Sequence, residues 1–93
     1  MRRAARADNN QADIVSALRK AGAEVYIIRQ PVDLLVYWRG RWLPVEVKEP
    51  DKRGTINEFT VSQRRFFEAT RGPVAVVYDA DGAIRLISEL ARP

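Results

Sequence analysis

The chain has 93 residues, enough for one small domain, and its 46% hydrophobic and 9% aromatic content excludes a disordered chain. It contains neither cysteine nor histidine, which excludes disulfides, thiolate nucleophiles, the usual zinc sites and serine–histidine triads. Sixteen Lys and Arg against twelve Asp and Glu give a net charge of +4, which favours contact with polyanions such as nucleic acid.

A helix and a strand are predicted for the first part of the chain, after a basic arm at residues 1–7 that is expected to be disordered. The helix runs from about Asn9 to Ala21, because residues 8–10 offer N-caps and Gly22 is a suitable C-terminal residue. Its apolar positions have the spacing of one helical face and are Ile14, Val15 and Leu18. The β-branched and aromatic residues 24–28 then predict a strand.

Two further strands are predicted at residues 32–38 and 42–48, both rich in apolar and aromatic residues. The Arg39-Gly40 pair interrupts the apolar pattern between them, as a turn does. These two strands are therefore expected to form a hairpin.

A loop, a second helix and two strands are predicted for the remainder. Residues 49–59 are polar and include Pro and Gly, which indicates an exposed loop. Thr60 to Gln63 has the spacing of a capping box and opens a helix through about Thr70. The apolar run 74–78 predicts a buried strand, and a turn at 79–82 leads to a last strand at 84–87.

The predicted order of elements is α-β-β-β-α-β-β, in a single domain that spans residues 1–93. The strand after the second helix must rejoin the sheet by a crossover connection. The expected fold class is therefore α/β, with a mixed central sheet flanked by helices.

The polar residues of the predicted hairpin carry the chemistry. Residues two apart on a strand share a face, so Glu46 and Lys48 project together, and a turn near Arg39-Gly40 can bring Asp33 beside them. Two carboxylates can hold Mg2+ with a backbone carbonyl and water, and a nearby lysine can stabilise charge on a phosphate. The competing interpretation of an isolated Glu-x-Lys is an ion pair on a solvated sheet face.

The surrounding pattern resembles the PD-(D/E)XK nuclease superfamily and, more narrowly, its virus-type replication-repair nuclease (VRR-NUC) group, small phage-encoded members included. The resemblance covers roughly residues 8 to 80. Its most specific parts are Pro-x-Asp-Leu-Leu-Val at 31–36, Glu-Val-Lys-x-Pro at 46–50, and the Thr, Gln and Phe of the segment after them. It implies a restriction-endonuclease-like αβββαβ core.

The resemblance also implies the roles of particular residues. Asp33 and Glu46 match the metal-binding acids, Lys48 matches the catalytic lysine, and the carbonyl of Val47 would be a further metal ligand. Gln63, followed by Phe66, is similar to the glutamine–x–x–aromatic motif of the family.

Two positions depart from the family pattern. Val32 separates Pro31 from Asp33, where the family usually has the two residues adjacent. Gln11 falls where the family commonly carries a glutamate on the first helix. It shares the spacing of the buried positions Ile14, Val15 and Leu18, so its side chain is expected to point toward the metal site, although an amide brings no negative charge. A single metal ion is therefore expected, Mg2+ with Mn2+ able to substitute, and no organic cofactor.

Other polar and aromatic residues leave two interpretations open. Gln63 fits helix capping as well as contact with the site. Trp38 and Trp42 would stack on bases or on a second subunit, or would simply cover the sheet. Basic side chains could neutralise phosphates or be solvated surface charges, and they are Arg64, Arg65, Lys52, Arg53, Arg2, Arg3 and Arg6.

Three functions are compatible with this sequence. The first is a metal-dependent DNA endonuclease, and the resemblance implies selectivity for branched or Holliday-junction-like DNA in replication or repair. The second is a nucleic-acid-binding module that keeps the nuclease fold but cleaves weakly, with Gln11 as its main support. The third is an interaction protein whose acids and lysine form surface ion pairs.

The expected surroundings follow from the length and the hydropathy of the chain. No apolar run approaches the about 18 residues of a membrane span, and the arginine-bearing start lacks a signal-peptide core. We expect a cytoplasmic protein of a bacterial or phage-infected cell that does not contact the membrane. A chain this short often completes its core by pairing, and stand-alone members of the family are dimers, so a homodimer is expected.

Overall fold

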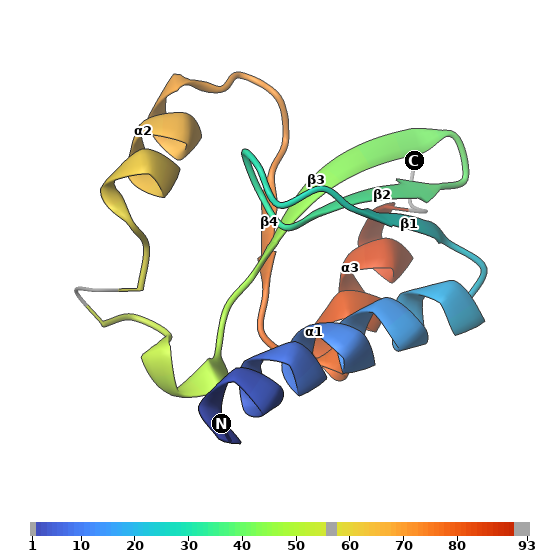
Figure 1. Cartoon of the computed structure of the whole chain (residues 1–93). Helices are drawn as coiled ribbons and strands as arrows, with labels where there is room; N and C mark the ends of the chain where they lie inside the picture. Colours follow the sequence, from blue (N-terminus) through green and yellow to red (C-terminus); the bar gives the residue numbers. More distant parts are fainter. Residues whose placement is uncertain (1, 56–57, 91–93) are drawn as a thin grey trace.

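The computed structural model describes residues 2–55 and 58–90, and it describes the side chains from residue 10 onward within these ranges. Its elements, in chain order, are α1 (Arg2–Lys20), β1 (Glu24–Ile27), β2 (Leu34–Trp38), β3 (Arg41–Val47), the short 3-10 helix η1 (Pro50–Lys52), α2 (Val61–Ala69), β4 (Ala75–Val77) and α3 (Ala80–Leu90). Figure 1 shows their arrangement. No helix in the described ranges is long and apolar enough to cross a membrane.

The four strands form one mixed sheet in the order β1-β2-β3-β4. The first three strands are antiparallel neighbours, and β4 lies parallel to β3 after the connection through α2. The mixed sheet and the crossover that the sequence predicts are therefore confirmed. The order α-β-β-β-α-β is also observed up to β4.

The hairpin of β2 and β3 turns through the two residues Arg39 and Gly40, which have φ of 47° and 88°. Positive φ at both central residues is the geometry of the two-residue turns that match the twist of antiparallel strands. Glycine adopts this backbone without strain, which explains the position of Gly40. The turn sets the register in which Leu34 lies opposite Val45.

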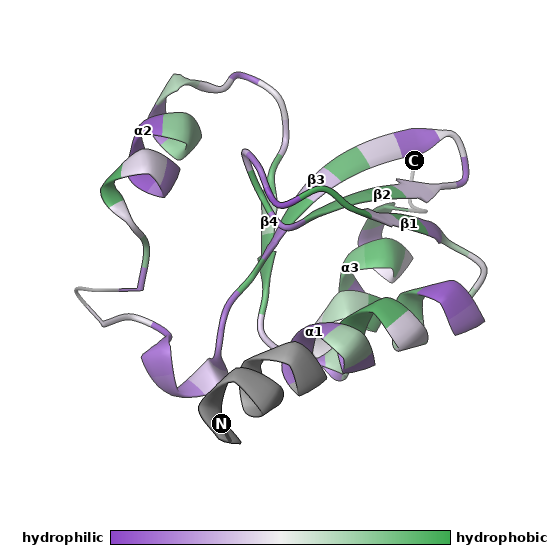
Figure 2. Cartoon of the chain, in the orientation of Figure 1, coloured by the Kyte–Doolittle hydropathy of each residue, from purple (hydrophilic) through white to green (hydrophobic). Residues whose placement is uncertain are grey.

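The hydrophobic core lies on one face of the sheet, under α1 and α3. Ile14 and Leu18 of α1 are fully buried there, with Leu34, Val36 and Val45 of the central strands. Helices α1 and α3 lie side by side against this face, whereas α2 stands apart from them (Figure 1). The strands and these two helices carry hydrophobic segments, whereas the segment around η1 is hydrophilic (Figure 2).

The predicted last strand at residues 84–87 is wrong, because this segment is part of helix α3. Asp79 starts the helix, with its Oδ1 accepting a hydrogen bond from the backbone N–H of Gly82 at 2.7 Å. The apolar side chains that face the core recur at helical spacing and are Ala83, Leu86, Ile87 and Leu90. The Asp81-Gly82 pair, typical of hairpin turns, lies in the first turn of the helix instead.

The first helix begins at Arg2 rather than near Asn9, so residues 8–10 lie within it and are not its N-cap. Its end after Lys20 agrees with the prediction, and Gly22 follows with a φ of 102°. The side chains of residues 1–9 lie outside the described part of the chain. The phosphate contacts predicted for Arg2, Arg3 and Arg6 therefore stay predictions.

Candidate active site

Asp33 and Glu46 lie directly beside each other at the end of the central hairpin. The pairing of Leu34 with Val45 places Asp33 and Glu46 opposite each other one position further along. The backbone N–H of Asp33 donates to Oε1 of Glu46 at 3.2 Å, and Oδ2 of Asp33 accepts from the backbone N–H of Val47 at 2.9 Å. Each acid is thus anchored to the backbone of the strand that carries the other.

Strand alternation explains why these acids leave the core. Val45 is fully buried and Val47 packs against the core, so Glu46 between them points to the opposite face of the sheet. Val32 and Leu34 are buried on either side of Asp33 in the same way. The extra residue at position 32 therefore adds a core side chain and leaves Asp33 facing Glu46.

Glu46 is almost completely buried, with 2% of its surface exposed, although it is an acid. Its pKa is raised to about 7, first by burial and then by the negative charge of Asp33, while Lys48 opposes the shift. A buried carboxylate beside another carboxylate is favourable only when positive charge or hydrogen-bond donors compensate for it. A cation beside the carboxylates of Asp33 and Glu46 would therefore be stabilised.

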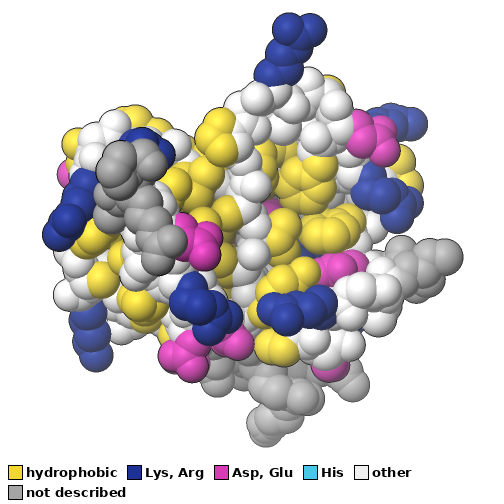
Figure 3. Space-filling model, turned by 180° about the vertical axis from the view of Figure 1, so that it is seen from behind, with side chains coloured by type: hydrophobic (Ala, Val, Ile, Leu, Met, Phe, Trp, Pro, Cys, Tyr) yellow, Lys and Arg dark blue, Asp and Glu magenta, His cyan; other side chains and the backbone are white. Residues whose placement is uncertain are grey.

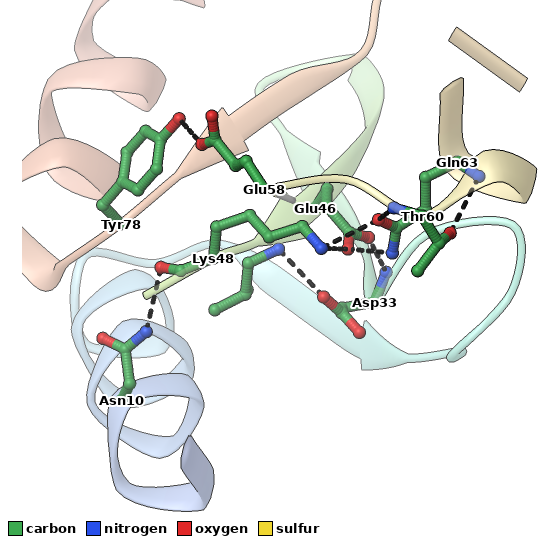
Figure 4. A network of polar contacts seen from close by, with 9 residues as sticks. Asn10, Asp33, Glu46, Lys48, Glu58, Thr60, Gln63 and Tyr78 are labelled. Atoms are coloured by element: carbon green, nitrogen blue, oxygen red, sulfur yellow. Dashed lines mark hydrogen bonds and ion pairs between the residues drawn. The ribbon is translucent and has the colours of Figure 1, made fainter. Parts of the chain in front are cut away.

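Lys48 supplies part of that compensation. Its Nζ lies 3.4 Å from Oε2 of Glu46 and donates to Oε1 of Gln63 at 2.8 Å. The ammonium also lies 5.3 Å from the centre of the Phe59 ring. The predicted shared face of Glu46 and Lys48 is thus confirmed, and Figure 4 shows the contacts of the lysine with Glu46 and Gln63.

Gln63 performs both of the roles that its position leaves open. It completes the capping box of α2 with Thr60, accepting from the Thr60 N–H at 3.0 Å while its own N–H donates to Thr60 Oγ1 at 3.1 Å. Its Nε2 donates to Oε2 of Glu46 at 2.6 Å. The same side chain therefore starts α2 and attaches it to the acid pair (Figure 4).

The first helix reaches the site through Asn10, which the sequence does not single out. Nδ2 of Asn10 donates to the backbone carbonyl of Lys48 at 3.2 Å. Gln11 is half-buried and lines a cavity of about 700 Å³ between α1 and β1, together with Val15 and Ile27. Among the hydrogen bonds of the described residues, Gln11 makes none to the acids or to Lys48.

A second missed residue, Glu58, fastens the loop after β3 to the end of β4. It is 8% exposed, and its carboxylate accepts hydrogen bonds from the Tyr78 hydroxyl and from the Gly54 N–H. The Tyr78 hydrogen bond, followed by that of Gly54, lowers the pKa of Glu58. The guanidinium carbon of Arg53 lies 3.9 Å from the centre of the Tyr78 ring. These contacts hold the loop beside Lys48 (Figure 4), and no local sequence signal could have predicted a pairing across 20 positions.

The remaining candidate residues for DNA contact lie on the surface. Arg64 and Arg65 are exposed on α2, and Lys52 and Arg53 are exposed on the loop after β3. Seen from behind the view of Figure 1, hydrophobic side chains gather in a central area, and both basic and acidic side chains lie around it (Figure 3). This face of the molecule therefore carries charges of both signs.

The two tryptophans point to opposite faces of the sheet. Trp38 packs against the core, as an aromatic that covers the sheet would. Trp42 is 51% exposed and lies next to Tyr37, with ring centroids 5.0 Å apart. Only Trp42 is thus available for stacking on a base or on a second subunit.

The donor set at the acid pair suits one hard divalent cation. Each carboxylate oxygen can accept more than the hydrogen bonds it receives here, so Asp33 and Glu46 retain capacity to hold an ion. Mg2+ commonly uses one or two protein carboxylates and keeps several waters. No group of three or more acidic side chains that could hold a metal occurs in the described residues.

Comparison with protein-family models, with curated proteins and with solved structures gives no match for this chain. The geometry of the site and the motifs of the sequence are therefore the basis for a functional assignment.

Proposed function

We propose that this protein is a metal-dependent endonuclease that hydrolyses phosphodiester bonds in DNA and prefers branched DNA, as the VRR-NUC resemblance implies. One observation carries the proposal. Asp33, Glu46 and Lys48 converge at one end of a hairpin, and the buried Glu46 depends on positive charge for its ionised form. A restriction-endonuclease-like core is part of the same proposal, supported by the order α-β-β-β-α-β and the parallel β3–β4 pair.

In this mechanism the chain supplies an anionic pocket and an ammonium donor. Asp33 and Glu46, with the Val47 carbonyl, would hold Mg2+, which when bound polarises the phosphate and acidifies a water molecule. Lys48 donates to the phosphate oxygens as negative charge develops on them. Gln63 keeps both Glu46 and Lys48 in place, because its amide is bonded to each of them.

The test is cleavage of labelled four-way, flapped and linear DNA with Mg2+, with Mn2+ and with chelator. We expect cleavage with either metal, none with chelator, and a loss of at least about a hundredfold in Lys48→Ala and Asp33→Asn, the scale on which electrostatic catalysis contributes. Lys20→Ala and Asp13→Asn, which make the same changes at exposed positions of α1, should retain activity. Cleavage that persists in chelator or in both site variants would refute the assignment.

A nucleic-acid-binding module is the second candidate, favoured by one observation. Gln11 lines the cavity between α1 and β1, and its uncharged amide adds no negative charge to the acid pair. Salt-sensitive DNA binding by the wild-type protein without cleavage under any metal would support this module. Absence of any salt-sensitive binding would instead favour an interaction protein with surface ion pairs.

We also propose that two copies pair through the open face of the sheet. Tyr26 and Trp42 are 49% and 51% exposed there, with ring centroids 6.1 Å apart. Large aromatic side chains are enriched at protein interfaces. A dimer would present one acid pair to each of two DNA strands.

A further inference from the structure

A separate cavity of about 330 Å³ opens between the β1–β2 connection and the start of α2. Arg29 and Pro31 form one wall, and Ser62 and Phe66 form the other. Gln63 also lines the cavity, while its amide is bonded to Glu46 and Lys48. A molecule in this cavity would therefore lie one side chain away from the acid pair.

The lining of the cavity combines apolar rings with positive charge. Phe66 is half-buried, and Pro31 adds a second apolar ring. Arg29 is exposed and provides a guanidinium, and Thr60 and Ser62 provide hydroxyl groups. None of the described residues that line the cavity is acidic. An aromatic ring with an anionic group is the ligand chemistry that fits such a lining.

We propose that this cavity binds one unpaired nucleotide next to the cleaved bond, with its base against Phe66 and its phosphate at Arg29. The choice of ligand rests on the proposed nuclease function. The volume lies at the low end of the about 300–1,000 Å³ of small-molecule sites, so it admits a single nucleotide and not a segment of duplex.

This assignment gives a physical reason for selectivity among DNA structures. A paired base must be unstacked and flipped before it can enter such a cavity, whereas an unpaired base enters without that cost. Stacking on one aromatic side chain is sequence-tolerant, because every base has a π-face. The cavity thus favours DNA with an unpaired nucleotide at the cleavage position, whatever its sequence.

The experiment compares the affinities of two labelled duplexes that differ only in one unpaired adenine, with Ca2+ replacing Mg2+ to limit cleavage. Wild type should bind the duplex with the unpaired base about tenfold more tightly, within the range of one base–aromatic contact. Phe66→Leu and Arg29→Ala should each reduce this preference at least severalfold. Phe67→Leu and Arg71→Ala remove a similar ring and a similar charge from residues that do not line the cavity, and should retain it.

A second readout places the base directly. When 2-aminopurine replaces the unpaired adenine, wild type should quench its fluorescence by stacking, and Phe66→Leu should not. If Phe66→Leu fails to fold, as judged by circular dichroism, the exposed Arg29→Ala variant decides the outcome. Equal affinity for the two duplexes, or a preference unchanged in both cavity variants, would overturn the proposal.

The outcomes separate this inference from the nuclease assignment. Metal-dependent cleavage that requires Lys48, without any preference for an unpaired base, would refute the nucleotide-binding cavity and leave the nuclease assignment intact. A preference that depends on Phe66 and Arg29, without cleavage, supports the cavity and refutes the nuclease.

Discussion

Gln63 donates a hydrogen bond to Glu46 at 2.6 Å across 17 positions of the sequence, and this contact attaches α2 to the sheet. The two residues come from elements that otherwise stand apart, as Figure 1 shows for α2. The amide oxygen of Gln63 also accepts hydrogen bonds from Nζ of Lys48 and from the backbone N–H of Thr60. The start of a helix and the candidate catalytic acid therefore depend on the same side chain.

Two substitutions separate the capping role of Gln63 from its role in the site. Thr60→Ala removes only the side chain that accepts from the Gln63 N–H, so it should lower the free energy of unfolding by about 1 kcal/mol and leave cleavage nearly unchanged. Gln63→Ala also removes the hydrogen bond to Oε2 of Glu46, and should lower stability by about 2–3 kcal/mol and cleavage by tenfold or more. Urea unfolding and initial cleavage rates measure both effects. Equal losses of activity in the two variants would contradict the positioning role.

Stability should depend on pH through Glu46. Its pKa is about 7 in the folded protein against 4.5 for the unperturbed group, so the folded state binds this proton more tightly. The free energy of unfolding should therefore fall as pH rises from about 4.5 to about 7 and then level off, by up to about 3 kcal/mol. Urea unfolding near pH 5, 6, 7 and 8 without divalent metal measures it.

Asp33→Asn provides the control for this pH dependence, because it removes one cause of the raised pKa of Glu46 and keeps the shape of the side chain. The fall in the free energy of unfolding with rising pH should be smaller in Asp33→Asn than in the wild type. In Asp13→Asn it should equal that of the wild type. Mg2+ should restore stability above pH 7, where Glu46 is ionised. A stability that is flat or rises between pH 5 and 7 is the contrary result.

Dimerisation through the open sheet face should depend on Trp42. Trp42→Ser removes the more exposed of the two rings, Tyr26 and Trp42, on this face. It should weaken association at least tenfold, since aromatic residues dominate such interfaces. Sedimentation equilibrium measures the dissociation constant. Val61→Ser, at an exposed apolar residue of α2, is the matched control. A wild-type protein that stays monomeric at high concentration would disprove the pairing.

Helix α3 should depend on its cap. Asp79→Ala removes the acceptor for the Gly82 N–H, and should lower the free energy of unfolding by about 1 kcal/mol. Asp13→Ala, an exposed acid in the middle of α1, should have little effect. If residues 84–87 were a strand, as the sequence suggested, Asp79→Ala would leave the helical circular dichroism signal and the stability unchanged.

Most of the fold could be predicted because the patterns behind it are local. The alternation of Val45, Glu46 and Val47 fixes which face each side chain takes, and the Arg39-Gly40 turn fixes their partner strand. The last segment differs because its sequence carries two conflicting signals: Asp81-Gly82 is typical of a hairpin turn, whereas Ala83, Ile87 and their apolar neighbours have the helical spacing that packs against the core.

The periphery of the site could not be predicted, for a different physical reason. Asn10 meets the Lys48 carbonyl only because α1 packs under the sheet, and its sequence neighbour Gln11 was chosen on family grounds. Glu58 lies in a polar loop, where nothing local marks it as buried. Its partner Tyr78 is brought close only when β4 pairs with β3.

The two-residue turn at Arg39 and Gly40 sets both the position of the acid pair and the packing of the core. Because side chains alternate along β3, a slip of β3 against β2 by one residue would send Glu46 toward the core and Val45 toward solvent. The loop between β3 and α2 is not bound by strand alternation, but Glu58 fastens it to Gly54 and Tyr78, and Phe59 of the loop lies against Lys48. The length of the hairpin is fixed by packing and chemistry together, and that of the loop by the contacts that hold it beside the site.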